Sequence, residues 1–160
     1  NAVLAKVGAG GAVCIYTLAA TDVIVDVNGY VPDGASPATV VPARLLETRV
    51  GEGLDTVDGQ FEGIGRQGAG TVLPVTVVGR GGVAGGATAV MVNVTAVLPD
   101  GPGYLTVFPC GEEQPLASNV NYAAGQVVPN AVLAKVGTGG RICVYTSSGT
   151  DLLIEVTGHL

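Results

Sequence analysis

Apolar and polar side chains alternate with a period of two along most of this 160-residue chain. In the segment 71–78, Leu73, Val75 and Val77 fall on one side of an extended backbone. Such alternation predicts a β-strand with one buried face. The same reasoning predicts strands at 87–97 and 104–108, and further strands around 43–49, 117–122 and 127–136.

Seven to nine short strands, separated by turns rich in Gly and Pro, predict an all-β protein. No segment shows a helical period, so we expect an antiparallel, jelly-roll-like β-sandwich without significant helix. A closed barrel or a trefoil-like arrangement is the alternative. The composition agrees with strands, because 26 residues are Gly and the abundant apolar residues are mainly Val and Ala.

One segment of the chain occurs twice. Residues 1–31 align without a gap to residues 130–160, and 17 of the 31 positions are identical. Most of the remaining differences keep the chemical type, such as Val13 for Ile142 and Asp26 for Glu155. Each copy contains two alternating runs separated by a small turn, which we interpret as a β-hairpin.

The offset between the two copies, 129 residues, is the size of a domain and indicates a tandem array. We interpret residues 1–31 as the C-terminal hairpin of a preceding repeat, 32–41 as a linker and 42–160 as a complete repeat. Because an isolated hairpin is marginally stable, residues 1–31 must pack on something. They belong to a preceding domain, pair along an edge of the second domain, or complete a neighbouring molecule. Alternatively, both hairpins lie in one pseudo-symmetric domain.

The three cysteines fit this organisation. Cys110 and Cys143 both lie on the strand face opposite the apolar one, so a disulfide can join them and imply an oxidising compartment. Cys14 is the counterpart of Cys143, so we expect it to be unpaired or bonded outside this segment. Three reduced thiols in a cytosolic protein are the alternative.

Several motifs in order resemble a tandem repeat domain of large secreted cell-surface proteins of actinobacteria. The resemblance is carried by PARLLETR (42–49), GRGGV (79–83), AVMVNVTAV (89–97), GYLTVFPCG (103–111), SNVNY (118–122) and NAVLAKVGTGG (130–140). It implies an extracellular or cell-surface location and a modular organisation. It supplies no catalytic residues, and such domains also occur attached to secreted hydrolases.

The charge pattern limits the partners. The net charge is −6 and the only lysines are Lys6 and Lys135, so the clustered cations that bind nucleic acid are missing. No uninterrupted apolar run is long enough to insert into a membrane. We expect neighbouring copies or repeats of the same protein, and a cell-wall polysaccharide, as partners.

Few residues suggest chemistry. His159 is the only histidine and lies near the end of the segment, where we expect an exposed strand end and not a catalytic base. The Gly-rich stretch 79–86 joins two strands, so it predicts a long hairpin turn and not a phosphate-binding loop. Consequently we expect no catalytic residues and no cofactor.

Two surfaces are weak candidates for a ligand. The acidic loop 51–63 contains possible Ca²⁺ ligands, although their spacing matches no EF-hand and a solvated loop is the simpler interpretation; they are Glu52, Asp55, Asp58 and Glu62. A sugar could stack on Tyr104 and Tyr122 and hydrogen-bond to Asn121.

The sequence therefore predicts a non-enzymatic extracellular structural or adhesive repeat module. In a sharper version, residues 1–31 add strands to a neighbour and link the modules into fibres. A carbohydrate-binding module attached to a secreted hydrolase is the alternative function.

Overall fold

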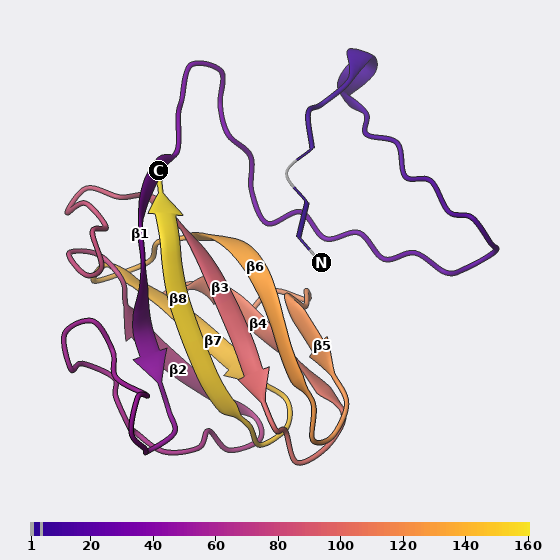
Figure 1. The fold of residues 1–160 in the computed structure, drawn as a ribbon. Helices are drawn as coiled ribbons and strands as arrows, with labels where there is room; N and C mark the ends of the chain where they lie inside the picture. Colours follow the sequence, from indigo (N-terminus) through magenta and orange to yellow (C-terminus); the bar gives the residue numbers. More distant parts are fainter. Residues whose placement is uncertain (1, 4) are drawn as a thin grey trace.

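The computed structural model describes residues 2–3 and 5–160 and contains two antiparallel four-stranded sheets packed face to face (Figure 1). This confirms the predicted β-sandwich. The eight strands are β1 (Ala38–Glu47), β2 (Thr71–Thr76), β3 (Ala89–Val97), β4 (Gly103–Pro109), β5 (Val120–Tyr122), β6 (Val127–Lys135), β7 (Arg141–Thr146) and β8 (Asp151–His159).

The strand order has the nested pairing of a jelly roll. The first sheet has the order β1-β8-β3-β6 and the second has the order β2-β7-β4-β5. β4 therefore pairs with β5, β3 with β6, β2 with β7 and β1 with β8, like one long hairpin rolled into two layers. The sheets do not close into a barrel.

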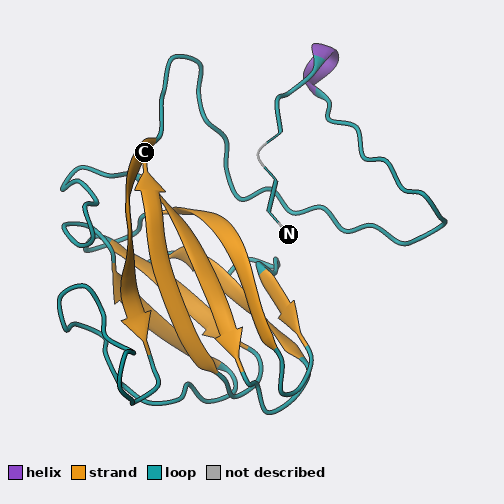
Figure 2. Ribbon diagram, in the orientation of Figure 1, coloured by secondary structure: helices purple, strands orange, loops and turns teal. Residues whose placement is uncertain are grey.

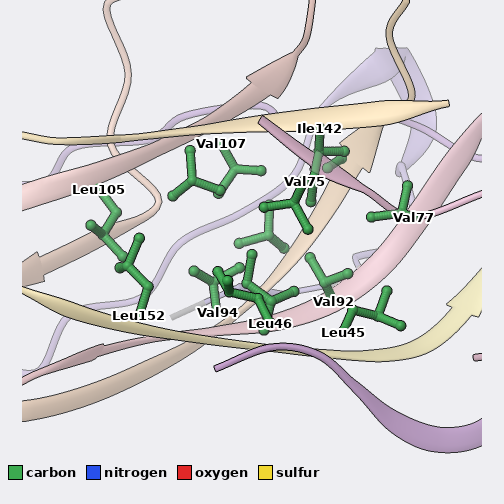
Figure 3. Close-up of a cluster of buried hydrophobic side chains, with 14 of the residues drawn as sticks. Leu45, Leu46, Val75, Val77, Val92, Val94, Leu105, Val107, Ile142 and Leu152 are labelled. Atoms are coloured by element: carbon green, nitrogen blue, oxygen red, sulfur yellow. The ribbon is translucent and has the colours of Figure 1, made fainter. Parts of the chain in front are cut away.

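The core lies between the two sheets and consists mainly of aliphatic side chains. Val75 and Ile142 of the second sheet, with Val77 just after β2, face the first sheet (Figure 3). Their counterparts there are Leu45, Leu46 and Leu152. All six are fully buried, and each fully buried aliphatic side chain stabilises the fold by about 1.5–3 kcal/mol.

The structure contradicts the prediction of a β-hairpin within residues 130–160. β7 and β8 belong to opposite sheets, and the turn between them carries the chain from one layer to the other. β7 pairs with β2 and β4, whereas β8 pairs with β1 and β3. The last three strands therefore have no pairing among themselves and depend on β1–β4 for their hydrogen bonds.

The same dependence on earlier strands explains why the N-terminal copy forms no strand. The described residues up to 37 form no strand and extend away from the sandwich, and they include only one short 3₁₀ helix, Ala9–Gly11 (Figures 1 and 2). Ile15 and Val27, whose counterparts in the second copy are buried, are 58% and 85% exposed. The pseudo-symmetric domain with both copies inside is thus wrong, because only the second copy lies in the sandwich.

The segment touches the sandwich at isolated points. The Ala2 amide donates to Asn130 Oδ1 at 2.9 Å, and Asn119 Nδ2 donates to Asn28 Oδ1 at 3.0 Å. The sandwich itself begins earlier than expected, because β1 starts at Ala38 and not at residue 42.

Candidate functional site

The disulfide and three aromatic side chains form a patch on the outer face of the second sheet. Cys110 and Cys143 are bonded, as the sequence predicted, and they pack against Phe108 and Tyr145. The Tyr104 ring lies beside Tyr145, with 5.8 Å between the ring centroids. We call these five residues the aromatic patch.

Part of the aromatic patch is accessible to a ligand. Tyr104 and Tyr145 are both half-buried, and Asn121 lies opposite Tyr104 in the pairing of β4 with β5 and is exposed. Partial burial and the neighbouring Tyr104 raise the pKa of the Tyr145 hydroxyl, so it stays protonated at neutral pH. The aromatic patch offers two phenol rings with their hydroxyls, and the Asn121 carboxamide lies beside it.

Tyr122 does not belong to this surface, and its assignment as a sugar contact is wrong. It points into the sandwich and is 6% exposed. Its hydroxyl lies 2.8 Å from Thr146 Oγ1 and accepts a hydrogen bond from the Ser148 amide at 3.2 Å. Tyr122 therefore fixes β5 to the end of β7, while Tyr145, which sequence reasoning missed, is the aromatic partner of Tyr104.

The acidic loop does not assemble a calcium site. Asp58 binds Arg80, and Glu62 Oε2 accepts a hydrogen bond from the Thr56 amide at 2.8 Å. Glu52 and Asp55 are exposed. Among the described residues, no three His, Cys, Asp or Glu side chains are grouped closely enough to hold a metal ion.

Arg80 organises the acidic loop instead. Its guanidinium is almost fully buried and binds Asp58 through two hydrogen bonds of 2.7 Å. It also donates to the carbonyls of Thr76, Leu45 and Gln60 at 2.8–3.1 Å. The hydrogen bonds from Arg80 lower the pKa of Asp58 from 3.8 to about 2. This arginine connects β1, the acidic loop and the end of β2.

The Gly-rich stretch 79–86 serves packing. It carries the chain from β2 in one sheet to β3 in the other, so the expected hairpin turn is wrong. At Gly81, φ is +54°, and a Cβ atom would lie 2.9 Å from Val156 Cγ1 and 3.0 Å from Ala43 Cβ. Only glycine fits this backbone conformation and this close approach, and the loop side chain Arg80 turns inward.

Arg44 and Arg49, on either side of the adjacent leucines Leu45 and Leu46, form ion pairs with carboxylates. Glu47 is fully buried, and Arg49 binds both of its carboxylate oxygens at 2.8 and 2.7 Å. Arg44 approaches Glu47 Oε2 at 3.4 Å and Glu155 Oε1 at 3.6 Å. The hydrogen bonds with Glu47 raise the pKa of Arg49. These side chains form a charged cluster towards the end of β1, in which Arg44 Nε is buried without a hydrogen-bond partner.

A third arginine joins the turns at the same end of the sandwich. Arg66 binds Asp100 at 2.7 Å and Asp151 at 2.8 Å, and it donates to the Gly149 carbonyl at 3.1 Å. The hydrogen bond with Asp100 and that with Asp151 raise the pKa of Arg66. This network fixes the β3–β4 turn against the β7–β8 turn.

His159 is less exposed than the sequence suggested. It lies within β8 and pairs with Ala38 on one side and with Val90 on the other, so it is half-buried and not a frayed end. A shallow depression near this end of the sandwich is lined mainly by glycines and aliphatic side chains, with Thr88 and Lys135 at its polar positions.

These features define a β-sandwich domain of the jelly-roll type, cross-linked by one disulfide, with four of its five arginines in ion pairs. In comparisons with models of protein families, with curated proteins and with solved structures, nothing matches the chain. No helix in the described part of the chain has the length and hydrophobicity needed to span a bilayer.

Proposed function

We propose that residues 38–160 are one unit of an extracellular tandem array, a structural or adhesive repeat module without enzymatic activity. In this proposal residues 1–31 are the last three strands of another such unit. The observation that carries it is the repeat itself: the second copy corresponds to most of β6 and all of β7 and β8, which pair only with earlier strands.

The sheet edges favour completion of a sandwich over strand addition. The edge strands are β1, β6, β2 and β5. Pro42, Pro74 and Pro129 interrupt three of them, and β5 has only three residues. Proline offers no amide donor to an incoming strand, and a short edge gives few hydrogen bonds. Residues 1–31 are therefore better suited to filling a place inside a sandwich than to extending one.

The disulfide supports the extracellular location, because such bonds persist in oxidising compartments. In the proposed array Cys14 has the role of Cys143 and bonds to a cysteine that corresponds to Cys110. The ordered motifs that resemble secreted actinobacterial repeats point the same way.

Disulfide mapping of the natural protein tests the proposal. The protein is isolated with free thiols blocked, digested without reduction and analysed by mass spectrometry. We expect Cys14 in a disulfide with a cysteine that ends a strand equivalent to β4. A free Cys14 thiol in the natural protein would refute the tandem arrangement.

A second experiment compares the full chain with a chain of residues 36–160. If residues 1–31 belong to another unit, both chains should unfold at the same urea concentration.

The aromatic patch supports a second candidate function, the binding of a cell-wall polysaccharide. Tyr104 and Tyr145 present half-exposed rings beside the carboxamide of Asn121, which suits stacking and hydrogen bonding to a sugar. Isothermal titration with soluble cell-wall polysaccharide should then show saturable binding that Tyr104→Ala abolishes. Tyr30→Ala is the matched control, because Tyr30 is 80% exposed and lies outside the patch. Equal binding by both variants would exclude this site.

A further inference from the structure

The first copy can reach the place of the second within its own chain. Tyr30 corresponds to His159, and His159 pairs with Ala38 at the start of β1. Only the seven residues Val31 to Pro37 separate Tyr30 from Ala38, which is enough for a loop between neighbouring antiparallel strands. Residues 1–31 followed by β1–β5 would then form a circularly permuted version of the same sandwich.

The strands alone discriminate weakly between the two copies. Twelve residues of the second copy are buried, and seven of them are identical in the first copy. Four others differ by a single carbon, such as Ile142 against Val13 and Leu152 against Val23. The twelfth is Gly149, whose counterpart is Ala20. Among the buried positions, the difference between the copies that changes more than one carbon of an aliphatic side chain therefore lies in the β7–β8 turn.

The β7–β8 turn of the second copy has contacts that the first copy cannot make. Ser147 Oγ accepts a hydrogen bond from the Tyr104 amide at 2.8 Å. The hydrogen bond from the Ser147 amide to the Tyr104 carbonyl, at 3.1 Å, uses backbone atoms alone and does not distinguish the two copies. The first copy has Leu18 here, which would leave the Tyr104 amide without its acceptor.

The position of Gly149 adds a second constraint. A Cβ atom at this position would fall on the carboxylate of Asp100, which Arg66 holds in place. Ala20 carries such a Cβ atom. Insertion of the first copy would thus displace Asp100 from Arg66 and disturb the network between the turns.

We propose that Leu18 and Ala20, in the turn of the first copy, exclude this copy from the sandwich of its own chain and direct it to a different partner. This partner is the β1–β5 portion of a like unit, with room at the position of Asp100 and a cysteine at the position of Cys110. The inference rests on the proposed role of residues 1–31 as strands of a second unit. It assigns the turn the task of preventing strand exchange between adjacent repeats, a characteristic failure of repeat proteins.

Refolding of the full chain provides the test, because the disulfide reports which copy occupies the sandwich. The resident copy gives Cys110–Cys143, whereas the permuted sandwich gives Cys14–Cys110. Two variants are reduced, unfolded, refolded in a glutathione buffer and mapped by mass spectrometry. The strand-matched chain carries Val13→Ile, Ile15→Val, Val23→Leu and Val25→Ile. The fully matched chain adds Leu18→Ser, Ala19→Ser and Ala20→Gly.

We expect Cys110–Cys143 to exceed Cys14–Cys110 by about tenfold or more in the strand-matched chain, and by less than about threefold in the fully matched chain. Near-equal amounts in the strand-matched chain would show that the turn does not exclude the first copy. A tenfold excess that persists in the fully matched chain would overturn the proposal as well.

A third variant changes the turn of the second copy and leaves that of the first copy unchanged. Adding Ser147→Leu, Ser148→Ala and Gly149→Ala to the strand-matched chain gives both copies the same unfavourable turn, so the two disulfides should again become comparable. If Cys110–Cys143 still dominates there, the turn is not the determinant. These outcomes do not depend on whether Cys14 is disulfide-bonded in the natural protein. Failure of this inference is therefore distinguishable from failure of the proposed function.

Discussion

Replacement of Arg80 by Met should destabilise the sandwich more than the same replacement at Arg141, which belongs to neither the Glu47 nor the Arg66 network. The Met side chain fills most of the same space but has no charge and donates no hydrogen bond. The Asp58 carboxylate then keeps only its hydrogen bonds from Gln60, and three backbone carbonyls lose the guanidinium as a donor. One carbonyl belongs to Leu45, which lies at an irregularity in the pairing of β1 with β8, between Arg44 and Leu46.

The magnitude follows from the burial of the pair. Removing one partner of a buried ion pair typically costs about 3–5 kcal/mol. The Asp58 side chain is 29% exposed and water can rehydrate it, which reduces its share of the cost. The buried carbonyl of Leu45 has no such access, and an unsatisfied buried acceptor costs about 1–3 kcal/mol. We therefore expect Arg80→Met to lower the free energy of unfolding by about 3–4 kcal/mol.

Urea unfolding of the full chain with its disulfide intact measures this loss. For a slope of about 1.5 kcal/mol per molar urea, the midpoint should fall by roughly 2 M. Arg141→Met is the matched control, because Arg141 is half-buried and donates only to the Thr138 carbonyl at 3.3 Å. A loss below about 1 kcal/mol for Arg80→Met, or an equal loss for the control, would refute the assignment of Arg80 as the organiser of the loop.

Three further predictions follow from the same structure. Because the pKa of Asp58 is lowered from 3.8 to about 2 in the folded state, its stabilisation is complete above pH 4 and is lost as the pH falls towards 2; the stability difference between wild type and Arg80→Met should shrink by about 1–2 kcal/mol over this range, and a constant difference would contradict the pairing. Gly81→Ala should cost about 2–4 kcal/mol in urea unfolding, against about 1 kcal/mol for Gly79→Ala, which has a similar φ of +76° but open space around its Cβ; equal costs would remove the packing argument. Replacing both Cys110 and Cys143 by Ala opens a cross-link over 33 residues and should lower the free energy of unfolding by about 3–4 kcal/mol, whereas Cys14→Ala should leave it unchanged.

The alternation of side chains predicted which face each strand buries but not which strand it pairs with. It placed Cys110 and Cys143 on the same outer face, and the disulfide confirms this. It could not reveal that β7 and β8 lie in opposite sheets, because both a hairpin turn and a crossover begin with the same small polar residues. The partner of a strand depends on the whole nested order of the sandwich, which no local pattern encodes.

The candidate sugar site shows an error that the sequence could have prevented. Asn121 and Tyr122 are adjacent in a strand, so their side chains must point to opposite faces, and one ligand could not contact both. Val120, two residues before Tyr122, is apolar and therefore marks the inward face. Tyr145 alternates in the same way with Val144 and could have been assigned to the outward face. The role of Arg80 had no comparable signal, because its partner lies in an irregular loop.

The pairing of Ala38 with His159 brings the beginning and the end of the unit side by side. Tension applied along a series of such units would separate β1 from β8 one residue pair at a time, since the two strands are pulled apart from their open end. The unit then resists the tension with the hydrogen bonds of one β1–β8 residue pair at a time, and not with those of all the pairs at once. As the rolled sheet comes apart, the bond between Cys110 and Cys143 would keep the intervening segment closed, which limits how far each unit can lengthen.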